Sequence, residues 1–366
     1  MFLWPIRYPC LGLSITTSAI HLLEVHRDWR RGWAAYHVRD LGRRELPPGL
    51  LRVSPGQSNV TDVAALAQEI RTLAGKRTGL PVALSLPDHC ARLALFESDT
   101  LPKKPAEFEA MVRWRFQTEC HAAVTDDRLA YCAFKPTGRR AEDVKGVKVL
   151  AMAMRQDVCD GYLQAAEAAG LIPARAVPAG LGYFDACLGA MNAGVRGPRG
   201  APNADAPSAF FLYMSEDGLS FLAFHHGSPV LLRTKSRRGA ASESGAPFES
   251  WLAQEVQATL EFYRNRFVSP QSEAGGAMSP LFAVRAYDRG GTQAPPERAE
   301  SRSPDAQDVR PSEAVEEEPL CVAARAASLP LTVVPLGWDT FPLSRVAPSR
   351  PLSASGLPAF GAVVAA

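Results

Sequence analysis

Short runs of alternating apolar and polar residues open the chain and predict a meander of three strands. These runs cover residues 11–15, 19–26 and 31–38, and alternation over such lengths is typical of strands with one buried face. Residues 61–75 then carry apolar groups at helical spacing, between a capping residue and a glycine stop. Residues 82–86 form a short strand of the buried type. This order of strands and helix predicts a mixed α/β domain.

The next part of the chain changes pattern and predicts a compact α+β unit. Its expected strands and helices alternate, with strands at 90–97, 128–134 and 147–154 and helices at 106–119 and 157–169. Such alternation favours a small sheet with two helices on one face. Trp114 and Phe116 lie on the first of these helices. We expect both in the core, because that helix must cover the sheet.

The second half of the chain repeats the opening meander. Expected strands lie at 209–214, 219–225 and 230–235, followed by a helix at 247–267 and a strand at 281–287. A helix at 321–328, a strand at 331–335 and a terminal helix at 355–366 complete the expected elements. A repeated order of elements predicts two related lobes, although the two copies share pattern far more than residues.

These patterns also predict the domain boundaries. Residues 1–87 form the first part of the first lobe, 88–172 an inserted α+β subdomain, 173–207 the return to the first lobe and a linker, and 208–366 the second lobe. Within the second lobe, residues 292–319 contain almost no large apolar groups, so they are predicted to be disordered.

Composition excludes several classes of function. The chain has 366 residues, 46% of them hydrophobic, and a formal net charge of +2. Such a weak charge gives no general attraction to nucleic acid, so no nucleic-acid partner is expected. The seven cysteines include no C-x-x-C pair, which favours a reducing compartment. No apolar run approaches the ~20 residues that a spanning helix needs. A cytoplasmic protein is therefore expected, and any role at a membrane must come through a partner.

The sequence lacks the common motifs of nucleophilic and metal catalysis. It contains no H-E-x-x-H, G-x-S-x-G or G-x-x-x-x-G-K-(S/T). Candidate chemistry is confined to a turn rich in hydroxyl groups between the first two strands, formed by Ser14, Thr16, Thr17 and Ser18. Its side chains could bond local backbone groups, or they could retain contact with a phosphate. Both interpretations stay open at this point.

Four stretches together resemble the PilM family of type IV pilus assembly proteins, which are relatives of FtsA in the actin-like ATPase superfamily. They are residues 11–25, residues 81–88 with 101–114, residues 149–155 with 162–173, and residues 227–233 with 255–263. The resemblance implies a two-lobed actin-like, or ribonuclease-H-like, α/β fold with a small inserted α+β subdomain. It places the hydroxyl-rich turn where such proteins have their first phosphate loop.

The nucleotide-contacting segments depart from the family pattern. The first loop usually reads Asp-x-Gly-(Ser/Thr)-(Ser/Thr), but here Ser14 replaces the acid and Thr16 the glycine. The second loop, near residues 213–215, keeps neither the acid nor the glycine of its Asp-x-Gly. Only Gly290 and Gly291 remain of the adenosine motif. We therefore expect no ATP hydrolysis and no catalytic residue, while ATP binding remains an open alternative.

Two further residues have a positional match in the resemblance. Glu255 matches an acid that would lie near a nucleotide ribose, and its alternative role is that of a solvated carboxylate on a helix surface. His21 stands where the family usually has the lysine that closes the first motif. A neutral imidazole is a poorer partner for phosphate.

The resemblance implies a scaffold of the type IV pilus inner-membrane platform. Its expected partner is the cytoplasmic N-terminal tail of a PilN-like bitopic protein, held in the seam between the first lobe and the inserted subdomain, with groove residues within 85–117. Other platform and motor proteins and a homo-oligomer are further implied partners. The alternatives are a nucleotide-binding ATPase or switch, and a GspL-like component of type II secretion. GspL-like proteins are normally fused to a transmembrane helix, and the absence of one before Ala366 favours the pilus interpretation.

Overall fold

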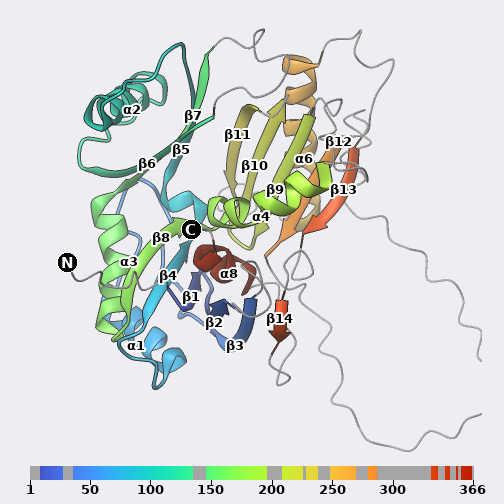
Figure 1. The fold of residues 1–366 in the computed structure, drawn as a ribbon. Coiled ribbons are helices and arrows are strands. Elements are labelled where there is room, and N and C mark those ends of the chain that lie inside the picture. Colours follow the sequence, from blue (N-terminus) through green and yellow to red (C-terminus); the bar gives the residue numbers. More distant parts are fainter. Residues whose placement is uncertain are drawn as a thin grey trace, which may run out of the picture.

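The structure is a computed structural model of the chain. It describes residues 9–27, 36–134, 146–195, 208–225, 228–237, 248–268, 279–286, 331–336, 343–346, 352 and 356–364. Two sheets face each other across a layer of helices, and a smaller sheet lies beside the first (Figure 1). The site described below lies where these units meet.

The first sheet has six strands in the order β14-β3-β2-β1-β4-β8. They are β1 (Leu11–Ile15), β2 (Ala19–Arg27), β3 (Tyr36–Glu45), β4 (Pro81–Leu86), β8 (Ile172–Pro178) and β14 (Leu343–Val346). β1 runs antiparallel to β2 and parallel to β4, so that Leu13 lies opposite both Leu22 and Leu84. All five residues of β1 are buried, as expected for a central strand with both faces covered.

Two helices cover the outer face of this sheet, α1 (Val63–Ala74) and α3 (Gln156–Ala168). Asp62 caps α1 by accepting a hydrogen bond of 2.9 Å from the N–H of Ala65. Gly75 ends it with φ of 59°, a conformation that favours glycine. The helix predicted over 61–75 is thus confirmed over Val63–Ala74. α3 was expected to cover the small sheet, but it packs beside α1 instead.

The second sheet has the order β11-β10-β9-β12-β13. Its strands are β9 (Ser208–Ser215), β10 (Gly218–His225), β11 (Ser228–Ser236), β12 (Ser279–Arg285) and β13 (Leu331–Leu336). In each sheet an antiparallel meander of three strands is extended by two parallel strands. The order therefore matches β3-β2-β1-β4-β8 position by position. The repetition predicted from the sequence is confirmed.

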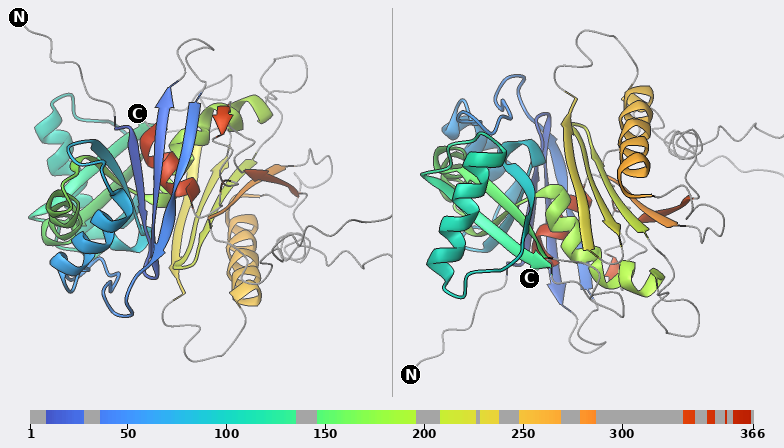
Figure 2. Two further views of the ribbon diagram at one scale, coloured as in Figure 1. Left: turned by 90° about the horizontal axis from the view of Figure 1, so that it is seen from below. Right: turned by 90° about the horizontal axis from the view of Figure 1, so that it is seen from above.

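Three helices complete the two lobes. α6 (Phe248–Phe267) covers the outer face of the second sheet through a stripe of buried residues that includes Trp251, Val256 and Leu260. α4 (Ala179–Val195) and α8 (Leu357–Val364) lie between the two sheets, as Figure 2 shows. Their apolar side chains form one core with residues of both sheets. The lobes are therefore joined by a continuous apolar core.

The inserted subdomain is a three-stranded sheet in the order β5-β7-β6, with one helix on it. The 3₁₀ turn η1 (Asp88–Cys90), packed on the core of the first lobe, leads into it, and its own elements are β5 (Arg92–Ser98), α2 (Pro105–Glu119), β6 (Asp127–Phe134) and β7 (Val147–Arg155). Phe116 is buried against the sheet, as predicted. The prediction for Trp114 is wrong, because this side chain is 56% exposed on the opposite face of α2. The two residues are only two positions apart, so they face different sides of the helix.

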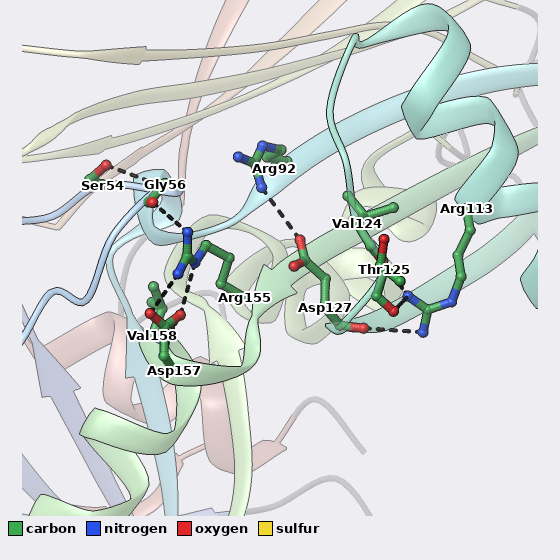
Figure 3. A network of polar contacts seen from close by, with 10 residues as sticks. All are labelled: Ser54, Gly56, Arg92, Arg113, Val124, Thr125, Asp127, Arg155, Asp157 and Val158. Carbon is green, nitrogen blue, oxygen red and sulfur yellow. Dashed lines mark hydrogen bonds and ion pairs between the residues drawn. The ribbon is translucent and has the colours of Figure 1, made fainter.

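A polar network fixes the inserted subdomain to the first lobe (Figure 3). At the end of β7 the guanidinium of Arg155 binds the carboxylate of Asp157 at 2.8 Å and 2.9 Å. It also donates to the carbonyl of Gly56, in a loop of the first lobe, at 2.7 Å. Arg92 on β5 approaches Asp127 at the start of β6, with an N–O distance of 3.4 Å. The bonds of Arg155 thus tie the end of β7 to the first lobe, and the Arg92–Asp127 pair holds β6 to β5.

Several boundaries differ from the sequence expectations. β14 and α8 belong to the first lobe, where β14 pairs with β3 and α8 contacts β1 and β4, although the sequence placed both segments in the second lobe. β14 was not predicted. β3 runs on to Glu45, beyond the expected end at 38, and α4 continues to Val195, into the expected linker. The predicted disordered segment 292–319 and the helix over 321–328 lie outside the described residues.

Candidate functional site

The turn between β1 and β2 brings together three of the four hydroxyl residues singled out from the sequence. The N–H of Thr16 donates to the carbonyl of Ala19 at 2.9 Å, which closes the turn, and its hydroxyl donates to the same carbonyl at 3.1 Å. Thr16 therefore bonds local backbone. Ser14 lies within β1, buried, with His21 and Ser85 on the neighbouring strands.

Thr17 and Ser18 reach across to the second lobe. The N–H of Thr17 donates to Oδ2 of Asp217 at 3.2 Å, and the Thr17 hydroxyl donates to Oδ1 of the same carboxylate. The Ser18 hydroxyl donates to Oε2 of Glu216, and Arg43 on β3 contacts Oε1 of Glu216 at 3.0 Å. We call this set of contacts between Thr17, Ser18, Arg43, Glu216 and Asp217 the interlobe clasp.

The two acids of the clasp form the tight turn between β9 and β10. This turn occupies the place in the second lobe that the hydroxyl-rich turn has in the first, because β9-β10 repeats β1-β2. Gly218 follows with φ of 150°, and a Cβ there would lie 2.1 Å from the carbonyl oxygen of Lys235. Glycine is therefore required where the turn passes this close to β11. The two corresponding turns thus contact each other directly.

A second polar contact between the lobes is centred on Asp88, which follows β4 in η1. Its Oδ1 accepts the N–H of Gly180, in the first turn of α4, at 2.7 Å, and its Oδ2 accepts the hydroxyl of Ser220 on β10. Burial raises the pKa of Asp88, while the bonds from Ser220 and Gly180 and the neighbouring His89 oppose this rise. Burial likewise lowers the pKa of His89. The Asp88 carboxyl thus joins the first lobe, α4 and the second lobe.

The remaining residues singled out from the sequence lie apart from this cluster. The imidazole of His21 is buried and contacts Asp40 at 2.9 Å. On α6, the carboxylate of Glu255 forms an ion pair with Arg233 of β11 at 2.7 Å, and Arg233 also donates to Thr259. Gly290 and Gly291 lie outside the described residues. The structure therefore brings Thr17 and Ser18 together with two acids, and it places Glu255 in a separate ion pair.

A pocket of about 200 Å³ lies in the seam between the inserted subdomain and the first lobe. It is lined by residues 130–132 of β6, residues 150–152 of β7, Arg175, Val177 and Pro178 of β8, and Leu181 and Gly182 of α4. Arg175 is the cationic residue of this lining, and partial burial lowers its pKa, which its neighbour Asp185 opposes. β6 and β8 are edge strands of their sheets among the described strands. A groove in this seam is also what the sequence predicted, but with its lining residues within 85–117.

Sequence reasoning missed the acids of the clasp and the bridging role of Asp88. Asp88 lies two residues after the end of a strand whose six residues are all buried, and an acid in that position is a usable signal. Glu216 and Asp217 were not among the residues singled out from the sequence. Their role depends on the approach of two turns about 200 residues apart in the chain, which no local pattern reports.

Comparisons with known proteins identify the fold. A solved structure described as a PilM-PilN type IV pilus biogenesis complex matches with a TM-score of 0.61 and 22% sequence identity over 98% of both chains. The fold is that of PilM. The resemblance and the fold class inferred from the sequence are thus confirmed.

Two further solved structures match more weakly. The cytoplasmic domain of EpsL, an inner membrane component of the type II secretion system of Vibrio cholerae, gives a TM-score of 0.37 and 13% identity over 76% of this chain and 83% of that chain. A protein of Bacteroides thetaiotaomicron with an actin-like ATPase fold gives a TM-score of 0.40 and 8% identity, over 77% of this chain and 85% of that chain. No protein-family model and no curated protein matches the sequence.

Two properties of the described residues bear on the PilM fold in this chain. None of their helices is both long and apolar enough to cross a membrane. They also contain no group of three or more His, Cys, Asp or Glu side chains arranged to hold a metal ion.

Proposed function

We propose that this chain is an actin-like scaffold of type IV pilus assembly that binds the cytoplasmic N-terminal tail of a PilN-like membrane protein, without hydrolysing ATP. The observation that carries the proposal is the match over 98% of both chains to a structure described as a PilM-PilN complex. The chain acts in the cytoplasm and reaches the inner membrane through this partner. Other platform and motor proteins are further partners of the same scaffold.

The pocket in the seam supports tail binding, because its shape and chemistry suit an extended peptide. Edge strands offer unpaired N–H and C=O groups, and a peptide that adds a strand to such an edge gains backbone hydrogen bonds. β6 and β8 both contribute to the pocket, and apolar side chains such as Leu150 and Leu181 line it. The guanidinium of Arg175 offers donors to a carbonyl or carboxylate of the peptide.

Two features support a role without hydrolysis. The position of the acid that would organise a metal ion in the first loop is held by Ser14, which is buried inside the sheet. The donors of the same turn that face the second lobe are engaged by Glu216 and Asp217. We expect phosphate release from Mg-ATP at the rate of a blank, and release that scales with protein concentration would contradict this part of the proposal.

A titration with a synthetic peptide tests tail binding. The probe is the N-terminal tail of the PilN-like protein, with a fluorophore at its C-terminal end and binding read by anisotropy. Ala130→Arg places a long side chain in the pocket from an exposed position on β6, so the fold should not change. We expect it to weaken binding at least tenfold. Ala106→Arg, at an exposed position on α2, is the matched control and should bind like the wild type.

Two results would count against the proposed function. The first is the absence of saturable binding at high micromolar peptide. The second is equal affinity of Ala130→Arg and the wild type, which would place the peptide elsewhere. Circular dichroism and thermal melts of both variants would show that the fold is retained.

A further inference from the structure

In the β1–β2 turn, the donors of Thr17 and the hydroxyl of Ser18 are satisfied by carboxylates of the opposite lobe. A turn that binds an anion offers backbone N–H groups and hydroxyls that converge on one point. Here the N–H and hydroxyl of Thr17 converge on Asp217, and the hydroxyl of Ser18 converges on Glu216. An ionised carboxylate accepts hydrogen bonds and donates none. It therefore satisfies the same donors that a phosphate oxygen would satisfy.

The clasp is built from several contacts that share groups. Glu216 accepts from Ser18 with one oxygen and from Arg43 with the other, so a single side chain of the second lobe holds β2 and β3 of the first lobe. The neighbouring Asp217 holds Thr17 by two bonds to its two oxygens. Both acids lie in the tight turn after β9, whose position is fixed by a further bond from the N–H of Arg237 to the carbonyl of Asp217.

A second bridge lies on β10, three residues after Asp217, and here the second lobe supplies the donor and the first lobe the acceptor. There Ser220 of the second lobe donates to Asp88 of the first. The two bridges lie at the end of the second sheet that faces the β1–β2 turn, beside the apolar core that α4 and α8 form between the sheets. Polar bridges in both directions, next to an apolar core, fix both the distance and the register of the two lobes.

We propose that the interlobe clasp holds the two lobes closed without a nucleotide, with the carboxylates of Glu216 and Asp217 in the place of a bridging anion. The clasp is an intramolecular contact, so it acts at a fixed and high effective concentration. Closure is then a constant property of the chain and does not depend on the ATP level. This inference concerns the cleft and stands independently of peptide binding in the seam.

Hydrogen exchange of the Thr17 amide tests whether the clasp acts as one unit. Glu216→Ala removes the contacts to Ser18 and Arg43 but leaves both bonds from Thr17 to Asp217 in place. If the contacts hold the lobes together as a unit, the Thr17 amide should exchange about tenfold faster in this variant, because loss of hydrogen bonds to a charged group makes opening easier. Mass spectrometry on peptides that cover residues 14–20 gives the readout.

Glu69→Ala is the matched control, because it removes an ion pair between Glu69 and Arg44 within the first lobe. Its exchange in residues 14–20 should equal that of the wild type. Thr17→Val, which removes one donor and keeps the N–H, should accelerate exchange in residues 216–222 of the opposite turn. Both altered residues of the clasp are partly exposed, so neither change threatens the fold.

Two outcomes would overturn the inference. One is unchanged Thr17 exchange in Glu216→Ala, which would mean that the contacts form and break separately. The other is additional protection of residues 14–20 in the wild type when millimolar Mg-ATP is added, which would mean that an anion displaces the carboxylates. Unchanged exchange of the wild type with Mg-ATP, together with faster exchange in Glu216→Ala, supports the clasp.

Discussion

Asp88 offers the sharpest test of how the two lobes are joined. Its carboxyl accepts the N–H of Gly180 and the hydroxyl of Ser220, and its side chain lies in a buried site between η1, α4 and β10. Asp88→Ala removes both acceptors at once. The N–H of Gly180 belongs to the first turn of α4, which has no partner within the helix for such a group. Both donors are then left unsatisfied in a buried place.

The expected cost follows from the two bonds that are lost. A buried donor without a partner costs about 1–3 kcal/mol. Two such donors together lower the free energy of unfolding by about 2–5 kcal/mol, because water that enters the site satisfies part of their hydrogen bonding. Asp88→Asn keeps one acceptor and should cost about half as much. Asp160→Ala, which removes a partly exposed ion pair with Arg128, is the control and should stay within about 0.5 kcal/mol of the wild type.

Urea denaturation of the single and double variants measures these values. A double-mutant cycle of Asp88→Ala with Ser220→Ala isolates the bond between the lobes, and we expect a coupling free energy of about 1–3 kcal/mol. The m-value should be unchanged if each variant unfolds in one transition. A coupling near zero, or a cost below 0.5 kcal/mol for Asp88→Ala, would refute the view that this carboxyl bridges the lobes.

Three further predictions concern pH, the helix layer and Glu255. Burial raises the pKa of Asp88 above its ordinary value of 3.8, so the folded state holds this proton more tightly. The contribution of Asp88 to the free energy of unfolding is therefore full below about pH 4 and is lost as the pH rises through the pKa that Asp88 has in the folded state. Asp88→Asn should remove this pH dependence of the unfolding free energy, measured by denaturation across pH. Gly12→Ala puts a Cβ 2.2 Å from a carbonyl oxygen of α8 and should lower the unfolding free energy by about 2 kcal/mol or more. Gly56→Ala is its control and should change the unfolding free energy little, because the nearest atom to the added Cβ is the hydroxyl oxygen of Ser54 at 3.8 Å. Glu255→Gln breaks the partly exposed pair with Arg233 and should cost at most about 1 kcal/mol, and a larger loss would show that the carboxylate has another role.

The lost motifs and the new contacts occur at the same places. Where the family pattern has an acid and a glycine in the first loop, this chain has Ser14 and Thr16. Where the second loop would carry its acid, the acids of this chain lie further along, in the turn itself, and point to the first lobe. These substitutions suit a protein whose two lobes bind each other, and they fit the proposed role of a scaffold.

The sequence by itself determined the elements and their repetition. The short apolar runs of β1, β2, β9 and β10 and the helical spacing in α1 and α6 are local properties of the chain, because the side chains of a strand or helix take their positions from the backbone period alone. The caps of α1 were also readable. The same patterns indicated an α/β chain with two related lobes and located the hydroxyl-rich turn, while the resemblance to the PilM family implied the actin-like fold.

Only the tertiary structure decided which residues meet. α3 packs on the first sheet and not on the small one, Trp114 points outward, and β14 and α8 belong to the first lobe. The pairing of Thr17 with Asp217 joins residues 200 positions apart. No period in the chain encodes such a contact, because it depends on how two completed sheets dock through the helices between them. For that reason the sequence showed only that the hydroxyl-rich turn departs from the phosphate-loop pattern of the family it resembles, and the structure showed what Thr17 and Ser18 bind.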